Sequence, residues 1–256
     1  MGSTALAAAL AEIPLAQLAL VAAVALFASV VGGVAGYGTG ALMPLVLVPI
    51  VGAEPVVPII AISALFTNSG RALAFRPYID PRRAWLVIAG AVPPCLLSAY
   101  GYTLLTGTGA MLVIGAMLTL TVPLRYFLKR RAIRFGDGGL VAGAFAYGVA
   151  VGGTVGAGVI LLSVLMAAGL DGAAVVATDA AISVVIGIAR LSVFGLAGVV
   201  DARVLVFALL IGGVALPGAF IARAFVDRLP IHVHTAILDV VVLVGGLVMI
   251  AGALRR

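Results

Sequence analysis

The chain has 256 residues, of which 64% are apolar and only 9% are charged, and its mean hydropathy is +1.32. Soluble domains carry about 25% charged residues, so a water-facing surface of ordinary extent is excluded. Long apolar runs without alternation exclude a β-barrel and favour a polytopic helical membrane protein. The net charge of +6 is placed in short loops, where membrane topology explains it better than nucleic-acid binding does.

Ten apolar segments follow one another along the chain, separated by charged residues, glycine and proline. In the first half they are Ile13–Val31, Thr39–Val51, Pro55–Phe75, Ala84–Leu105 and Gly109–Leu128. In the second half they are Gly139–Val151, Gly158–Gly169, Ala173–Ala197, Val204–Val226 and Val233–Leu254. This order predicts an all-α membrane protein with a first repeat over residues 1–128, a basic cytoplasmic linker over 129–138 and a second repeat over 139–256.

Two glycine clusters punctuate this order. "VGGVAGYG" at Val31–Gly38 recurs as "VGGTVGAG" at Val151–Gly158, at an offset of 120 residues. Glycine destabilises a helix interior by about 1 kcal/mol relative to alanine, so each cluster predicts a helix break. The same offset places Ala61-Ile62-Ser63 on Ala181-Ile182-Ser183, and this shared register predicts that the two halves arose by duplication.

Lysine and arginine predict the orientation of the chain. The loop around Arg76 and the run Arg125–Arg134 should face the cytoplasm. The first two apolar segments are together too long for one crossing of a core about 30 Å thick, so we expect a Gly-broken hairpin that enters and leaves on one side. Each half then has an odd net number of crossings, which makes the repeats inverted. A parallel arrangement is the alternative, because inversion puts four arginines outside, namely Arg190, Arg203, Arg255 and Arg256.

Four stretches carry a resemblance to a known family. They are "GGVAGYGTGALMPLVL" (Gly32–Leu47), "GGTVGAGVILLSVL" (Gly152–Leu165) and the loops "YIDPRRAW" and "VVDARVLV". With their order and duplication, the chain resembles the TauE/SafE sulfite exporter family, also called the 4-toluene sulfonate uptake permease family, from about Leu15 to Leu254. The resemblance implies a transporter of the bacterial inner membrane that exports small sulfur-containing anions such as sulfite, sulfoacetate or other organosulfonates.

The glycine clusters themselves favour an anion site. A helix break inside a membrane is tolerated where it lines a wet cavity, and helix N-termini bind oxyanions through unpaired N–H groups. Short helices that begin near Gly40 and Gly158 would point two such N-termini at one central site between the repeats. The candidate substrate-binding residues at the breaks are Gly36, Tyr37, Gly38, Thr39, Thr154, Gly156 and Gly158. The alternative is that these glycines only let helices pack closely.

Polar residues inside the apolar segments complete the candidate site. Asn68 and Arg71 lie in the first half and Arg190 in the second, and each is a candidate contact to the substrate. Arg71 is also close enough to a helix end for its side chain to reach the membrane surface. Asp179 is unhelpful beside an anion when charged, so it is a candidate for proton coupling or a structural partner of an arginine.

Enzymatic activity is not expected. The sequence contains no HExxH pair, no Gly-x-Ser-x-Gly elbow and no Walker A loop, so neither a metal nor another cofactor is predicted. An anion channel of the same fold is the alternative function, because glycine breaks also suit a continuous pore. The expected partners are a small anion and the lipid bilayer, with proton coupling and a homodimer left open, and nucleic acid is not expected.

Overall fold

A computed structural model describes residues 3–35, 39–130, 134–225 and 231–255, and within these ranges it is all-helical. The first half contains α1 (Ser3–Glu12), α2 (Leu15–Ala35), α3 (Thr39–Val51), α4 (Val56–Ala74), a 3-10 turn (Arg76–Tyr78), α5 (Pro81–Thr103) and α6 (Gly107–Arg130). The second half contains α7 (Asp137–Gly153), α8 (Gly158–Ala167), α9 (Gly172–Leu196), α10 (Ala202–Phe225) and α11 (Ile231–Leu254). The predicted all-α class is confirmed.

Several helices are long and apolar enough to cross a bilayer. Among the described residues they are α4, α5, the Gly107–Phe127 part of α6, and α9, and the pair α1–α2, bent by 96°, makes a fifth when counted as one span. Shorter apolar helices include α3 and α8, the two that follow the glycine clusters. Apolar helices of this number and length make the chain a multi-pass membrane protein.

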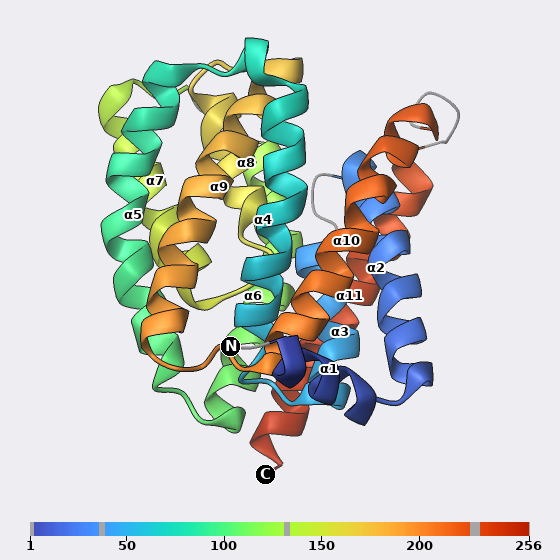
Figure 1. Ribbon diagram of the computed structural model, residues 1–256. Coiled ribbons are helices and arrows are strands. Elements are labelled where there is room, and N and C mark those ends of the chain that lie inside the picture. The colour runs from blue at the N-terminus through green and yellow to red at the C-terminus, as the bar shows by residue number, and fades with distance from the viewer. Residues whose placement is uncertain (1–2, 36–38, 131–133, 226–230, 256) are drawn as a thin grey trace.

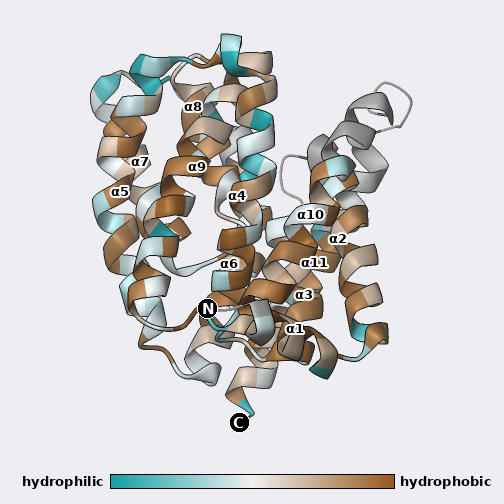
Figure 2. Cartoon of the chain, in the orientation of Figure 1, coloured by the Kyte–Doolittle hydropathy of each residue, from teal (hydrophilic) through white to brown (hydrophobic). Residues whose placement is uncertain are grey.

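The helices run up and down through one bundle (Figure 1). Helix α4 ascends in this view and α9 descends beside it, so the two are antiparallel, and both chain ends lie toward the lower side. Hydrophilic residues gather at the upper end (Figure 2). There Arg82, at the start of α5, pairs with Asp137, at the start of α7, over 2.6 Å. Asp80 begins α5 by accepting a hydrogen bond from the N–H of Arg83.

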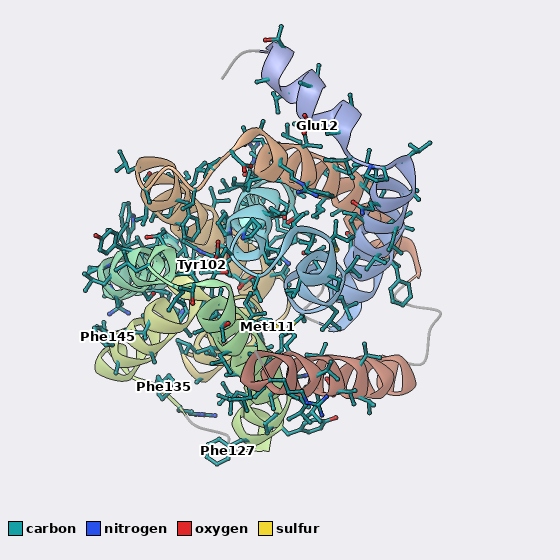
Figure 3. The ribbon with its side chains drawn as sticks, turned by 90° about the horizontal axis from the view of Figure 1, so that it is seen from below. Glu12, Tyr102, Met111, Phe127, Phe135 and Phe145 are labelled. Carbon is teal, nitrogen blue, oxygen red and sulfur yellow. The ribbon has the colours of Figure 1, made fainter. Side chains whose placement is uncertain are left out.

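Helix packing follows a symmetric pattern. Helix α5 packs along α7 as α2 packs along α10, and α5 packs on α9 as α10 packs on α4. Helix α6 lies against a tilted α11, as the view from below shows (Figure 3). When α2 to α6 are matched in order with α7 to α11, the α5–α7 pair corresponds to the α10–α2 pair and the α5–α9 pair to the α10–α4 pair. The α6–α11 pair corresponds to itself. Duplication would give this pattern, and the duplication itself stays a prediction.

The glycine clusters turn out to serve two purposes. Gly32 and Gly33 lie within α2, and Gly152 and Gly153 lie within α7, so the expected breaks do not include these first pairs. A side chain on Gly152 would collide with the hydroxyl of Ser98 in α5, and α7 can therefore approach α5 closely only because this position is glycine. Close packing therefore accounts for Gly152, and the break in the second half lies further along the chain.

Candidate functional site

The second helix break lies where the sequence predicts it. Helix α7 ends at Gly153 and α8 begins at Gly158, and Thr154–Ala157 between them are not helical. Gly156 has φ = +84°, a conformation that side-chain-bearing residues rarely adopt. In the first half, α2 ends at Ala35 and α3 begins at Thr39. The candidates Gly36, Tyr37 and Gly38 lie outside the described residues.

The beginnings of α3 and α8 come together, although they belong to different halves of the chain. A Cβ atom added to Gly40, in the first turn of α3, would lie 3.4 Å from the backbone nitrogen of Gly156. Thr121 of α6 borders the same point, since its Oγ1 would lie 3.4 Å from a Cβ atom on Gly156. The first turn of α3 and the residues just before α8 therefore lie close together, with room for little more than one carbon atom between Gly40 and Gly156.

The start of α8 also faces open space. Among the described residues, no atom outside the local chain lies within 4 Å of the position that a Cβ atom on Gly158 would take. In the first turn of α8 the N–H of Ile160 already donates to the carbonyl oxygen of Ala157, so the donors left for an anion are those of the first residues of the helix. A helix N-terminus also carries about half a positive charge. The arrangement thus offers backbone donors and room for a small anion at the same place.

Arg190 of α9 brings a full positive charge to this region. The residue is only 6% exposed, and its Nη2 donates a hydrogen bond of 3.0 Å to the carbonyl oxygen of Thr154, within the break. Its guanidinium carbon lies 5.8 Å from the centre of the Phe194 ring, and its buried Nε has no hydrogen-bond partner. No carboxylate in the described part of the chain pairs with it. Arg190 is thus a buried cation with an unused donor.

The other predicted arginine is in a different situation. Arg71 of α4 pairs with Asp179 of α9 through Nη2 and Oδ2 at 2.5 Å, and the aspartate side chain is only 9% exposed. Next to it, the hydroxyl of Thr178 accepts a hydrogen bond from the N–H of Asp80. Asp179 therefore has an arginine partner, which was one of the two interpretations left open by the sequence, and the charge of Arg71 is neutralised.

The remaining candidates are placed around these groups. Thr39 is half-buried at the first position of α3, and Asn68 is half-buried on α4, three residues before Arg71. The hydroxyl of Thr154 donates to the carbonyl oxygen of Ala150 in the last turn of α7. The structure thus brings Gly156, Gly158, Thr154 and Arg190 together with the start of α3, and places Arg71 and Asp179 in a separate ion pair.

Sequence reasoning missed a second intramembrane charge pair. Asp239 of α11 is 5% exposed and accepts hydrogen bonds from Arg125 at 3.2 Å and from the hydroxyl of Tyr126 at 3.0 Å. An aspartate inside the apolar run Val233–Leu254 was the signal that could have indicated it. This pair joins α6 to α11 and leaves neither charge uncompensated.

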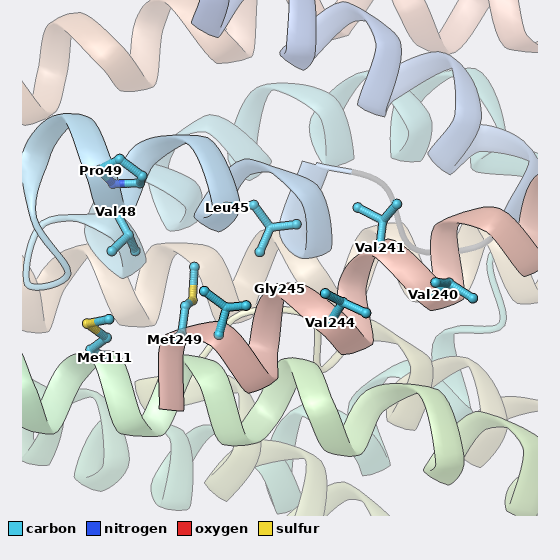
Figure 4. A pocket seen from close by; sticks show the side chains of 10 residues that line it. Leu45, Val48, Pro49, Met111, Val240, Val241, Val244, Gly245 and Met249 are labelled. Atoms are coloured by element: carbon cyan, nitrogen blue, oxygen red, sulfur yellow. The ribbon is translucent and has the colours of Figure 1, made fainter. Parts of the chain in front are cut away.

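A sizeable groove lies elsewhere, between α3, α6 and α11 (Figure 4). Its volume is about 500 Å³, and every residue that lines it is apolar, including Leu45 of α3, Met111 of α6 and Met249 of α11. A groove without a donor or a positive charge does not suit an anion. The candidate site is therefore the region of the helix breaks.

The described part of the chain thus combines several apolar helices of membrane-spanning length with a helix break beside a buried arginine. The family model described as sulfite exporter TauE/SafE matches residues 21–249. The chain belongs to the TauE/SafE sulfite exporter family, as its motifs predicted, and this is a family of membrane transporters rather than enzymes. Comparisons with curated proteins and with solved structures find no match.

Proposed function

We propose that this protein is a secondary transporter that exports small sulfur-containing anions, such as sulfite, sulfoacetate or other organosulfonates, across the bacterial inner membrane. Transport proceeds by alternating access at a mid-membrane site between the two halves. The observation that carries the proposal is Arg190, a buried cation without an acidic partner among the described residues, hydrogen-bonded to the helix break before α8.

The energetic argument starts from the cost of burying a charge. Removing one ion from water costs several kcal/mol even after the protein relaxes, and only an opposite charge with good hydrogen bonds offsets this cost. Arg71 and Arg125 have such partners in Asp179 and Asp239. For Arg190 a bound oxyanion would supply the missing charge, and the first-turn N–H groups of α3 and α8 would satisfy its oxygens.

The proposed site therefore includes the Gly-rich residues at both breaks. Gly156 and Gly158 keep side chains away from the N–H groups of α8, and Arg190 fixes the orientation of the anion. Gly36, Tyr37, Gly38 and Thr39 precede or begin α3 and form the opposing side in this proposal, and Asn68 supplies an amide donor from α4. We assign proton coupling to Asp179, because its protonation would end the ion pair with Arg71. The net charge of the α4–α9 contact between the halves would then rise by one.

Uptake of radiolabelled sulfite into proteoliposomes tests the proposal. The wild-type protein should show saturable uptake, and Arg190→Gln and Gly158→Leu should abolish it while both proteins remain inserted. Matched controls are Arg203→Gln, an exposed arginine at the start of α10, and Gly213→Leu, a glycine of α10 with open space around it. Both controls should transport normally.

Two results would contradict the proposal. Flux that rises in proportion to concentration without saturation would indicate the channel instead of the carrier. Normal uptake by Arg190→Gln would place the anion site elsewhere in the protein.

A further inference from the structure

Helices α4 and α9 each contain one arginine, and the residue eleven positions before it differs between the two helices. Asp179 precedes Arg190 by eleven residues on α9, and Ile60 precedes Arg71 by eleven residues on α4. Eleven residues make about three helical turns, or about 16 Å, so both members of each pair lie on one face of their helix.

The antiparallel packing of α4 and α9 sets these pairs against each other (Figure 1). At one end Arg71 meets Asp179. Between the two ends, the side chain of Leu65 occupies the space that a side chain at Gly187 would take. Because the two spacings are equal, the other end brings Ile60 level with Arg190. The upper contact is thus an ion pair, whereas at the lower end the register places Ile60, which is 5% exposed, on the turn of α4 that is level with Arg190.

The formal charge of the site follows from this difference. Arg71 is neutralised by Asp179, and Arg125 has Asp239 as its partner. The break between α7 and α8, residues 154–157, contains no ionisable carboxylate or cationic residue. Among the described intramembrane residues, Arg190 alone adds an uncompensated charge, and the site therefore carries one net positive charge.

We propose that the site selects anions that carry a single negative charge, an inference that rests on the proposed function. The free-energy cost of removing an ion from water rises with the square of its charge. Its attraction to Arg190 and to the helix N-termini rises only in proportion to the charge. Within the proposed substrates this narrows the preference to hydrogensulfite and alkanesulfonates, which should bind more tightly than sulfate and than the dianions sulfite and sulfoacetate. Ile60 determines this specificity because an apolar side chain leaves the charge of Arg190 available to the anion. An acid at the same position would neutralise Arg190.

Isothermal titration of the purified full chain in lipid nanodiscs tests the selectivity. Methanesulfonate and sulfate are the probes, because their charges stay at one and two across the neutral pH range. The wild-type protein should bind methanesulfonate at least about tenfold more tightly than sulfate, and Arg190→Gln should lose this binding. Equally tight, Arg190-dependent binding of sulfate would overturn the selectivity and leave the proposed function intact. Binding of neither probe by the wild type would overturn both.

A matched pair of variants tests the role of Ile60. Ile60→Glu supplies the carboxylate that Arg190 lacks and should abolish methanesulfonate binding. Ile60→Gln introduces a side chain of the same size without the charge and should retain binding within about threefold. If Ile60→Glu still binds methanesulfonate as the wild type does, Ile60 does not face Arg190 and its assignment is wrong. The comparison of probes on the wild type decides the selectivity even where Ile60→Glu does not fold.

Discussion

Two arginines on neighbouring helices should have opposite effects on the stability of the anion-free protein. In the variant Arg71→Gln, the carboxylate of Asp179, whose side chain is 9% exposed, loses its partner. Breaking a fully buried pair in this way costs about 3–5 kcal/mol. Because the Arg71 side chain is 34% exposed, solvent screening reduces the effect, and we expect a loss of about 1–3 kcal/mol.

The variant Arg190→Gln should be neutral or stabilising in the absence of anions. It removes a charge whose burial costs several kcal/mol. The losses are the charged hydrogen bond to the Thr154 carbonyl, worth about 1.5–3 kcal/mol, and the contact with Phe194, worth about 0.5–2 kcal/mol. Glutamine keeps an N–H donor for Thr154, so a net gain of about 1–2 kcal/mol is expected, or a rise in Tm of roughly 2–8 °C.

Thermal unfolding of the purified proteins in nanodiscs measures both effects. Addition of methanesulfonate at about one hundred times its Kd should stabilise the wild type by about 2.7 kcal/mol and leave Arg190→Gln unchanged. Arg203→Gln is the control for loss of an exposed arginine. The reasoning is refuted if Arg190→Gln destabilises the anion-free protein as strongly as Arg71→Gln does, because Arg190 would then have a structural countercharge.

Three further predictions concern coupling, backbone conformation and pH. Asp179→Asn imitates the protonated acid, so it should still bind the anion but lose the pH dependence of proteoliposome uptake; identical pH profiles for both proteins would remove Asp179 from coupling. Gly156→Ala places a Cβ atom on a residue with φ = +84°, so it should destabilise the folded protein by about 1–2 kcal/mol and slow transport. The control Gly213→Ala lies in a helix interior and should stabilise the protein by about 0.5–1 kcal/mol in the same unfolding assay. The N–H of Arg83, which donates to Asp80, lowers the pKa of that carboxyl group, so its stabilising effect is present above its unfolded pKa and is lost as the pH falls through the folded value. Asp80→Asn should therefore lower stability by about 0.5–1 kcal/mol at neutral pH and have no effect in strong acid, and a constant difference across this range would contradict the assignment.

Local sequence signals predicted the helix starts well. Helices α3 and α8 begin at Thr39 and Gly158, within a residue of the expected positions, and Gly156 adopts the conformation that glycine favours. These features depend on the conformational preferences of a few neighbouring residues, and those preferences can be judged from a single sequence. The leading glycines could not be assigned in this way, because the reason for Gly152 is the position of Ser98 on another helix.

The ionic partners were beyond the reach of local patterns. Asp179 and Arg71 are 108 residues apart in the chain, and Asp239 and Arg125 are 114 residues apart. Spacing along one helix indicated only that Asp179 and Arg190 share a face, and the packing of α4 on α9 then decided that Asp179 pairs with Arg71. Which cation remains uncompensated is therefore a property of the tertiary structure, although every residue involved is visible in the sequence.

The difference between the two ends of the α4–α9 contact has a physical rationale. An acid at both Asp179 and the position of Ile60 would neutralise both arginines and leave no charge for an anion. An apolar residue at both positions would bury two uncompensated cations, and each would cost several kcal/mol without a bound ligand. One acid and one isoleucine keep a single cation for the substrate and stabilise the other contact by an ion pair. In this proposal anion binding depends on a difference in charge between the two ends of the α4–α9 contact, and Asp179 and Ile60 make that difference.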